Sequence, residues 1–156
     1  MELCDNNQIQ IFLQLLLAAI LGGLVGLERG YKRKEAGLRT YALVSVGSAL
    51  FTIIGFEIFS GFISKTGISF DPSRIIAAVV MGVGFIGTGL IIYRQFHIEG
   101  LTTAAGLWLV AAIGSAVGSQ LYMIAIFAAF LGIGILSGLR LIEEKLFGKD
   151  SEEAKK

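Results

Sequence analysis

The sequence predicts an all-α fold: a polytopic transmembrane bundle of five helices, with the N-terminus outside and the C-terminus cytoplasmic. Of its 156 residues, 54% are hydrophobic and only 16% are charged, whereas a soluble domain has about 25% charged residues. The mean hydropathy is +0.76. The charged residues gather in short islands between long uncharged runs, and the basic ones fall unevenly on alternate islands. Composition and charge placement together therefore predict a multi-pass membrane protein.

The uncharged runs cover residues 6–27, 40–56, 75–93 and 100–139. A spanning helix needs about 20 mostly apolar residues, so the first three runs predict one span each and the fourth predicts two. Gly118-Ser119-Gln120 interrupts the fourth run with small and polar residues, which favours a turn there. Continuous apolar runs, instead of short alternating segments, argue against strands. The predicted spans are 9–27, 40–62, 75–93, 101–117 and 121–142.

The chain thus divides into a transmembrane domain over residues 1–142 and a short charged cytoplasmic tail over residues 143–156. The first span is expected to stay in the protein. Glu2 and Asp5 stand where a signal peptide has basic residues, and Glu28-Arg29 follows in place of a small-residue cleavage site.

The basic residues predict the orientation. With five spans, eleven of the 13 Lys and Arg residues fall on one side of the membrane, and only Lys65 and Arg74 fall on the other. Cytoplasmic loops carry this excess of positive charge, so the C-terminus is expected in the cytoplasm. Tyr41, Tyr93 and Tyr122 fall at predicted span ends, where aromatic belts form.

Glycine is abundant, at 21 residues, and small residues let helices approach closely in lipid. We expect helix-packing faces at Gly22 and Gly26, Gly114 and Gly118, and Gly134 and Gly138. Further packing glycines are expected in the third span, at Gly82, Gly84, Gly87 and Gly89.

Residues 82–87 match the G-x-G-x-x-G dinucleotide fingerprint in letters. That motif needs a preceding strand and a helix that opens at the glycines, and here it lies inside an apolar span. We therefore expect no cofactor. Cys4 and His97 fall on opposite sides of the predicted membrane, which excludes a Cys–His pair within one chain, and a net charge of +1 does not indicate nucleic-acid binding. The sequence predicts no enzyme, no catalytic residue and no metal site.

Ionisable and hydroxyl residues near the membrane surface are the candidate functional residues, because burying a charge in lipid is costly. On the inner face, Glu28 and Arg29 end the first span, Arg39 opens the second, and Thr102 and Thr103 open the fourth. Lipid anchoring by Arg29 to Arg39 is the simpler interpretation of this face.

Two further features lie elsewhere in the predicted membrane domain. On the outer face, Glu57 and Arg74 either pair or reach the interface independently. Trp108 falls in mid-span, where a buried packing role is expected.

In this order, several segments resemble the MgtC/SapB family of bacterial inner-membrane proteins. They are Gly26-Leu27-Glu28-Arg29, Ala36-Gly37-Leu38-Arg39-Thr40, Arg74 with residues 82–89, and Gly100 to Ala105 with Trp108. The family often has an acidic residue at the position of Gly30 and a Gln at the position of Ala78. Because only a short tail follows the fifth span, the chain is similar to the SapB-like members that have the membrane domain alone.

The resemblance implies a multi-pass protein of the bacterial inner (plasma) membrane linked to low-magnesium adaptation and virulence. For some members it also implies inhibition of the F-type ATP synthase. We expect a small regulatory protein that acts through contacts with other membrane proteins, because the glycine-rich faces suit helix–helix contact. The alternatives are a transporter of Mg²⁺ or another solute formed as a homo-oligomer, and a structural assembly subunit.

Overall fold

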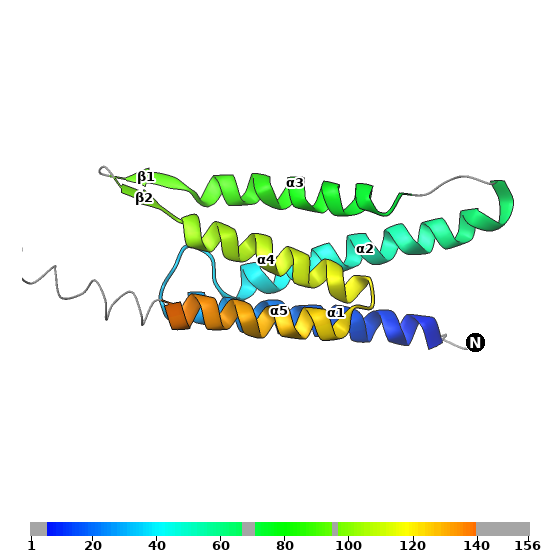
Figure 1. The fold of residues 1–156 in the computed structure, drawn as a ribbon, viewed down its shortest axis with the longest axis horizontal. Helices are drawn as coiled ribbons and strands as arrows, with labels where there is room; N and C mark the ends of the chain where they lie inside the picture. The colour runs from blue at the N-terminus through cyan, green and yellow to red at the C-terminus, as the bar shows by residue number, and fades with distance from the viewer. Residues whose placement is uncertain (1–5, 67–70, 95–96, 140–156) are drawn as a thin grey trace, which may run out of the picture.

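The computed structural model describes residues 6–66, 71–94 and 97–139 of the chain, and Figure 1 shows their arrangement. Its elements are α1 (Asn6–Tyr31), α2 (Leu38–Thr66), α3 (Ser73–Leu90), β1 (Ile92–Arg94), β2 (His97–Glu99), α4 (Leu101–Gly118), α5 (Tyr122–Gly134) and a π-helical turn, η1 (Ile135–Leu139). Five helical segments in this part of the chain are long and apolar enough to cross a membrane. The predicted helical bundle of five spans is confirmed.

The first two helices contain the predicted spans 9–27 and 40–62 and extend beyond them, to Tyr31 and Thr66, and the third span requires a correction. The third span was expected to reach residue 93, but α3 ends at Leu90 and β1 begins at Ile92. There the chain forms an antiparallel hairpin, in which Tyr93 pairs with Ile98. Gly100 then takes φ +88, a left-handed conformation that glycine adopts without steric cost, and so turns the chain into α4. Residues 140–142 of the predicted fifth span and the predicted tail lie outside the described residues.

The helices lie side by side along one long axis (Figure 1). α4 is the most buried of them and packs against each of the other four helices. α1 and α2 pack on each other, α5 covers α1 and α4, and α3 lies mainly on α4. On α3 only Val79, Val83 and Gly87 are buried. The bundle therefore has a packed body of four helices and one peripheral helix.

Glycines at the crossings of α1, α2 and α4 allow these helices to approach closely. A Cβ on Gly22 would lie 2.5 Å from Ser45 Cβ, and one on Gly26 would lie 2.6 Å from Tyr41 Cβ. On α4, a Cβ on Gly114 would collide with the Ser45 carbonyl oxygen, and one on Gly118 would lie 2.7 Å from the Ala49 carbonyl oxygen. These four predicted packing glycines are at helix–helix contacts, as small residues are in lipid.

The other predicted packing glycines do not lie at close helix–helix contacts within the chain. A Cβ on Gly82, Gly84, Gly89, Gly134 or Gly138 would meet no atom within 4 Å, and one on Gly87 would reach only Ala104 Cβ, at 3.5 Å. These five open glycines contact no neighbouring helix in the described part of the chain, and their role in helix packing stays a prediction. The reason for the lack of contact is the peripheral position of α3 and the outward direction of Gly134 on α5 and Gly138 on η1.

A stripe of buried polar residues runs along α2. Tyr41, Ser45, Ser48 and Thr52 are each at most 3% exposed and follow one another at steps of four, three and four residues. This spacing places them on one helix face, the face that contacts the glycines of α1 and α4. Thr52 donates a hydrogen bond to the Ser48 carbonyl oxygen at 2.8 Å, which satisfies its hydroxyl inside the helix.

Candidate functional site

A cluster of charged and hydroxyl side chains lies where α1 ends and α2 and α4 begin. We call it the loop-end cluster, and it comprises Glu28, Arg29, Lys32, Glu35, Tyr41 and Thr103. The Glu28 carboxylate accepts a hydrogen bond from Arg29 Nε at 2.7 Å and also pairs with Lys32 Nζ. The side chains of Glu28 and Arg29 are only 9% and 6% exposed. One carboxylate thus holds two cations at the end of α1.

Thr103 joins three segments within this cluster. Its carbonyl oxygen accepts a hydrogen bond from the Tyr41 hydroxyl at 2.9 Å. Its own hydroxyl donates to Glu35 Oε2 at 3.0 Å. Tyr41 is completely buried, and its hydroxyl occupies the space that a side chain at Gly106 would need. Through Thr103, α4 therefore holds both α2 and the loop of residues 32–37.

Hydrogen bonds hold the pKa of Glu35 below its ordinary value. The main cause is the hydrogen bond from its own backbone, to which the Thr103 hydroxyl and the positive charges of Lys34 and Arg29 add. Partial burial acts in the opposite direction. Because the folded-state pKa is lowered, this contribution to stability is present above the unfolded pKa and is lost as the pH falls through the folded pKa.

Thr103→Val is expected to raise the pKa of Glu35 toward its ordinary value, because the hydroxyl that stabilises the ionised carboxylate is removed while the side-chain volume stays similar. A ¹³C NMR titration of the Glu35 carboxyl carbon in micelles measures this change. Thr102→Val is the matched control, since Thr102 is exposed beside the cluster. Equal Glu35 pKa values in wild type and Thr103→Val would disprove the contact.

The predicted inner-face residues are only partly brought together. Glu28, Arg29 and Thr103 lie in the cluster, whereas Arg39 and Thr102 are exposed beside it. Sequence reasoning missed Glu35 and misplaced Tyr41, which is buried in the bundle instead of lying in an aromatic belt. The sequence signal that could have placed Tyr41 inside the bundle is the polar stripe on α2, which begins at Tyr41 and continues at steps of four, three and four residues.

Trp108 requires a correction. It was expected to be buried in mid-span, but its side chain is 56% exposed on α4. The physical reason is helix periodicity, because the neighbouring positions Leu107 and Val110 take the completely buried face of α4.

At the opposite end of the bundle, α1 and α2 line a second polar region. Asn7 donates a hydrogen bond to Glu57 Oε1 at 3.2 Å. Both residues line a cavity of about 300 Å³, together with Gln10, Gln14, Ser119 and Gln120 among others. Gln14 is buried and donates to the Val117 carbonyl oxygen and the Tyr122 hydroxyl at 3.4 and 3.1 Å. Tyr122, predicted in an aromatic belt, is thus a hydrogen-bond partner of a buried amide.

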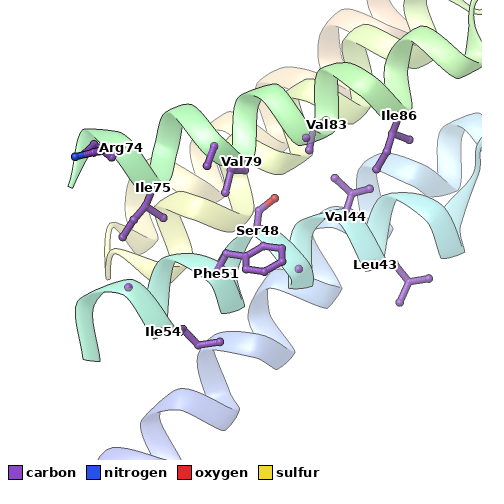
Figure 2. A pocket seen from close by; sticks show the side chains of 14 residues that line it. Leu43, Val44, Ser48, Phe51, Ile54, Arg74, Ile75, Val79, Val83 and Ile86 are labelled. Carbon is purple, nitrogen blue, oxygen red and sulfur yellow. The ribbon is translucent and has the colours of Figure 1, made fainter. Parts of the chain in front are cut away.

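Arg74 lies on a different cavity. Together with residues of α2 and α3 it lines an apolar groove of about 790 Å³, which we call the α2–α3 groove (Figure 2). Glu57 and Arg74 therefore line separate cavities. The pairing of Glu57 with Arg74 stays a prediction.

The loop-end cluster holds a buried ion pair between Glu28 and Arg29 and joins α4 to α2 and to the loop of residues 32–37 by hydrogen bonds. Among residues 6–66, 71–94 and 97–139, no group of three or more His, Cys, Asp or Glu side chains could hold a metal ion. The polar groups of the cluster bond mainly to one another, which positions the loop of residues 32–37 against α4.

The family model and the similar proteins point to the same family. The family model described as MgtC family matches residues 15–145. The chain is 43% identical over 141 residues to the putative magnesium transporter YhiD of Escherichia coli strain K12, covering 90% of this chain and 66% of YhiD. It is 40% identical over 129 residues to protein MgtC of Brucella abortus strain 2308, covering 83% of this chain and 51% of that protein.

Protein SrpB of Synechococcus elongatus is 35% identical over 148 residues, covering 90% of this chain and 80% of SrpB. The chain thus spans between about half and two thirds of the length of YhiD and MgtC. No solved structure matches the chain.

Proposed function

We propose that this chain, which belongs to the MgtC family, is a regulatory membrane protein. It acts through helix–helix contacts with other membrane proteins. By resemblance to the family, this regulation serves low-magnesium adaptation in the bacterial inner membrane. The F-type ATP synthase is the candidate partner that the resemblance implies. The loop-end cluster would then face the cytoplasm, as the distribution of basic residues predicts.

The observation that carries the proposal is the exposed surface of α3, the least buried of the five helices. In the body, glycines of α1 and α4 contact the backbone and side chains of α2 directly, so side chains fill the interior. On α3, Met81 and Phe85 are 70% and 83% exposed, and a Cβ on Gly84 between them would meet open space. Large apolar side chains beside a glycine suit close packing of a partner helix.

The second candidate function is transport of Mg²⁺ by a homo-oligomer. The observation that favours it is the printed name of YhiD, a putative magnesium transporter that shares 43% identity. Such a path would have to form between chains, since the crossings of α1, α2 and α4 are filled.

Two measurements separate these functions. In liposomes loaded with a Mg²⁺-sensitive dye, the reconstituted chain is expected to give no more flux than protein-free liposomes. Flux that depends on Glu57 would overturn the regulatory proposal in favour of transport. Pull-down from mildly solubilised membranes is expected to recover subunits of a defined enzyme complex, whereas a structural assembly subunit would recover only itself.

A surface variant tests the α3 contact. Gly84→Leu is expected to abolish recovery of the partner complex, because the new side chain occupies the surface beside Phe85 without meeting atoms of its own chain. Gly134→Leu is the matched control on α5, where the added side chain also meets open space. Equal recovery with both variants would place the contact elsewhere.

A further inference from the structure

We propose that the α2–α3 groove binds the acyl chain of an anionic phospholipid, with the Arg74 guanidinium holding the lipid phosphate. This site goes beyond the proposed function and concerns a different face of α3 from Gly84. The occupant follows from the lining, the length and the charge of the groove.

The lining is apolar throughout the depth of the groove. Apart from Arg74 and Ser48, the groove is lined by aliphatic, aromatic and glycine residues of α2 and α3. Figure 2 shows Val44 and Ser48 of α2 pointing toward α3, with Ile75, Val79 and Ile86 of α3 pointing toward α2. Because a Cβ on Gly47 or Gly82 would meet no atom within 4 Å, the groove is open space at two of its lining positions.

The length of the groove fits one acyl chain. Its lining extends from Arg74 to Ile86 on α3 and from Leu43 to Gly55 on α2. At 1.5 Å per residue, either stretch is about 18 Å long. One leaflet contributes half of a hydrocarbon core that is about 30 Å thick, so an extended acyl chain covers about 15 Å.

The positive charge of Arg74 at the groove favours a lipid with an anionic headgroup. Arg74 is the single charged residue among those that line it, and it stands at the first turn of the span that begins at Ser73. Near it, Ile75 packs on Gly55, which brings α2 and α3 together at the end of the groove. The guanidinium therefore lies at headgroup depth, where an arginine binds a phosphate by two parallel hydrogen bonds, while the acyl chain extends along the groove.

Native mass spectrometry of the full chain, extracted in detergent with equimolar phosphatidylglycerol and phosphatidylcholine, tests the site. The wild-type chain is expected to retain phosphatidylglycerol about fivefold more often, the ratio that about 1 kcal/mol per arginine near an anionic surface gives. Arg74→Gln is expected to abolish this preference while phosphatidylcholine retention stays unchanged. Arg39→Gln is the matched control, an exposed arginine of α2 that does not line the groove.

Filling the groove provides a second, independent arm. Gly82→Leu and Gly47→Leu are expected to lower the retention of both lipids, because the new side chains occupy the groove without meeting atoms of the chain. Gly84→Leu, whose position is open but outside the groove, is expected to retain lipid as the wild type does. Unchanged thermal transitions establish that each variant is folded.

The proposal is overturned if Arg74→Gln keeps the preference for phosphatidylglycerol, or if both groove-filling variants retain lipid like the wild type. The proposal is also overturned if the wild-type chain forms dimers without lipid and Gly82→Leu dissociates them, because a second copy of the chain would then occupy the groove. Recovery of the partner complex with Gly84→Leu as with wild type would overturn the proposed α3 contact and leave the lipid site intact.

Discussion

Gly114→Val is expected to lower the free energy of unfolding by about 3 kcal/mol or more, the upper part of the range for overpacking a filled interior. A Cβ at this position would collide with the carbonyl oxygen of Ser45, and its distance to Ser45 Cα would be 3.0 Å. These atoms are backbone and cannot rotate away, so α2 and α4 must separate. Separation would also weaken the contact of Gly118 with Ala49 and the hydrogen bond from Tyr41 to Thr103.

Equilibrium unfolding in mixed micelles with increasing SDS measures this loss. Gly134→Val is the matched control, because the same substitution on α5 meets open space and is expected to change stability by no more than about 0.5 kcal/mol. If the two variants unfold at the same SDS fraction, Gly114 does not set the distance between α2 and α4.

Glu28→Ala is expected to cost about 3 kcal/mol, since removing one partner leaves the buried Arg29 guanidinium without its counter-charge. This loss lies at the low end of the range for breaking a buried ion pair, because Lys32, the other partner of Glu28, is 22% exposed and reaches water. The same unfolding titration measures the loss. Glu99→Ala, which removes an exposed carboxylate from β2, is the control and is expected to be nearly neutral.

A second substitution identifies the cause of the loss. Adding Arg29→Met to Glu28→Ala is expected to recover part of the lost stability, because the uncompensated charge is then replaced by an apolar side chain of similar length. If the double variant is no more stable than Glu28→Ala alone, the destabilisation does not come from an unpaired Arg29.

Much of the fold could be predicted because spans in lipid are fixed by length and the absence of charge. The uncharged run 100–139, interrupted at Gly118-Ser119-Gln120, predicted spans that meet between residues 117 and 121, and α4 ends at Gly118 and α5 begins at Tyr122, each within one residue. The end of α3 could not be predicted in this way. Its last predicted residues, 91–93, are as apolar as those of a span, yet residues 92–94 pair with residues 97–99 and Gly100 then turns the chain into α4.

The candidate site was harder to predict, because hydropathy indicates which residues are in the membrane but not which neighbours they have. Glu28 and Arg29 were identified from their position at a span end. The hydrogen bonds of Thr103 with Glu35 and Tyr41, and the effect of the Arg29 charge on Glu35, depend on tertiary neighbours. The packing glycines illustrate the same limit. Gly22 and Gly82 have similar surroundings in the sequence, but only the helix neighbours decide that Gly22 is in close contact and Gly82 is open.

The peripheral position of α3 has a consequence for the order in which the molecule loosens. With only Val79, Val83 and Gly87 buried, α3 is the least buried of the five helices, and local opening begins where few side chains are buried. The body of α1, α2, α4 and α5 does not depend on it, because these helices pack on one another directly. We therefore expect α3 to loosen from α4 at a lower free energy than global unfolding requires.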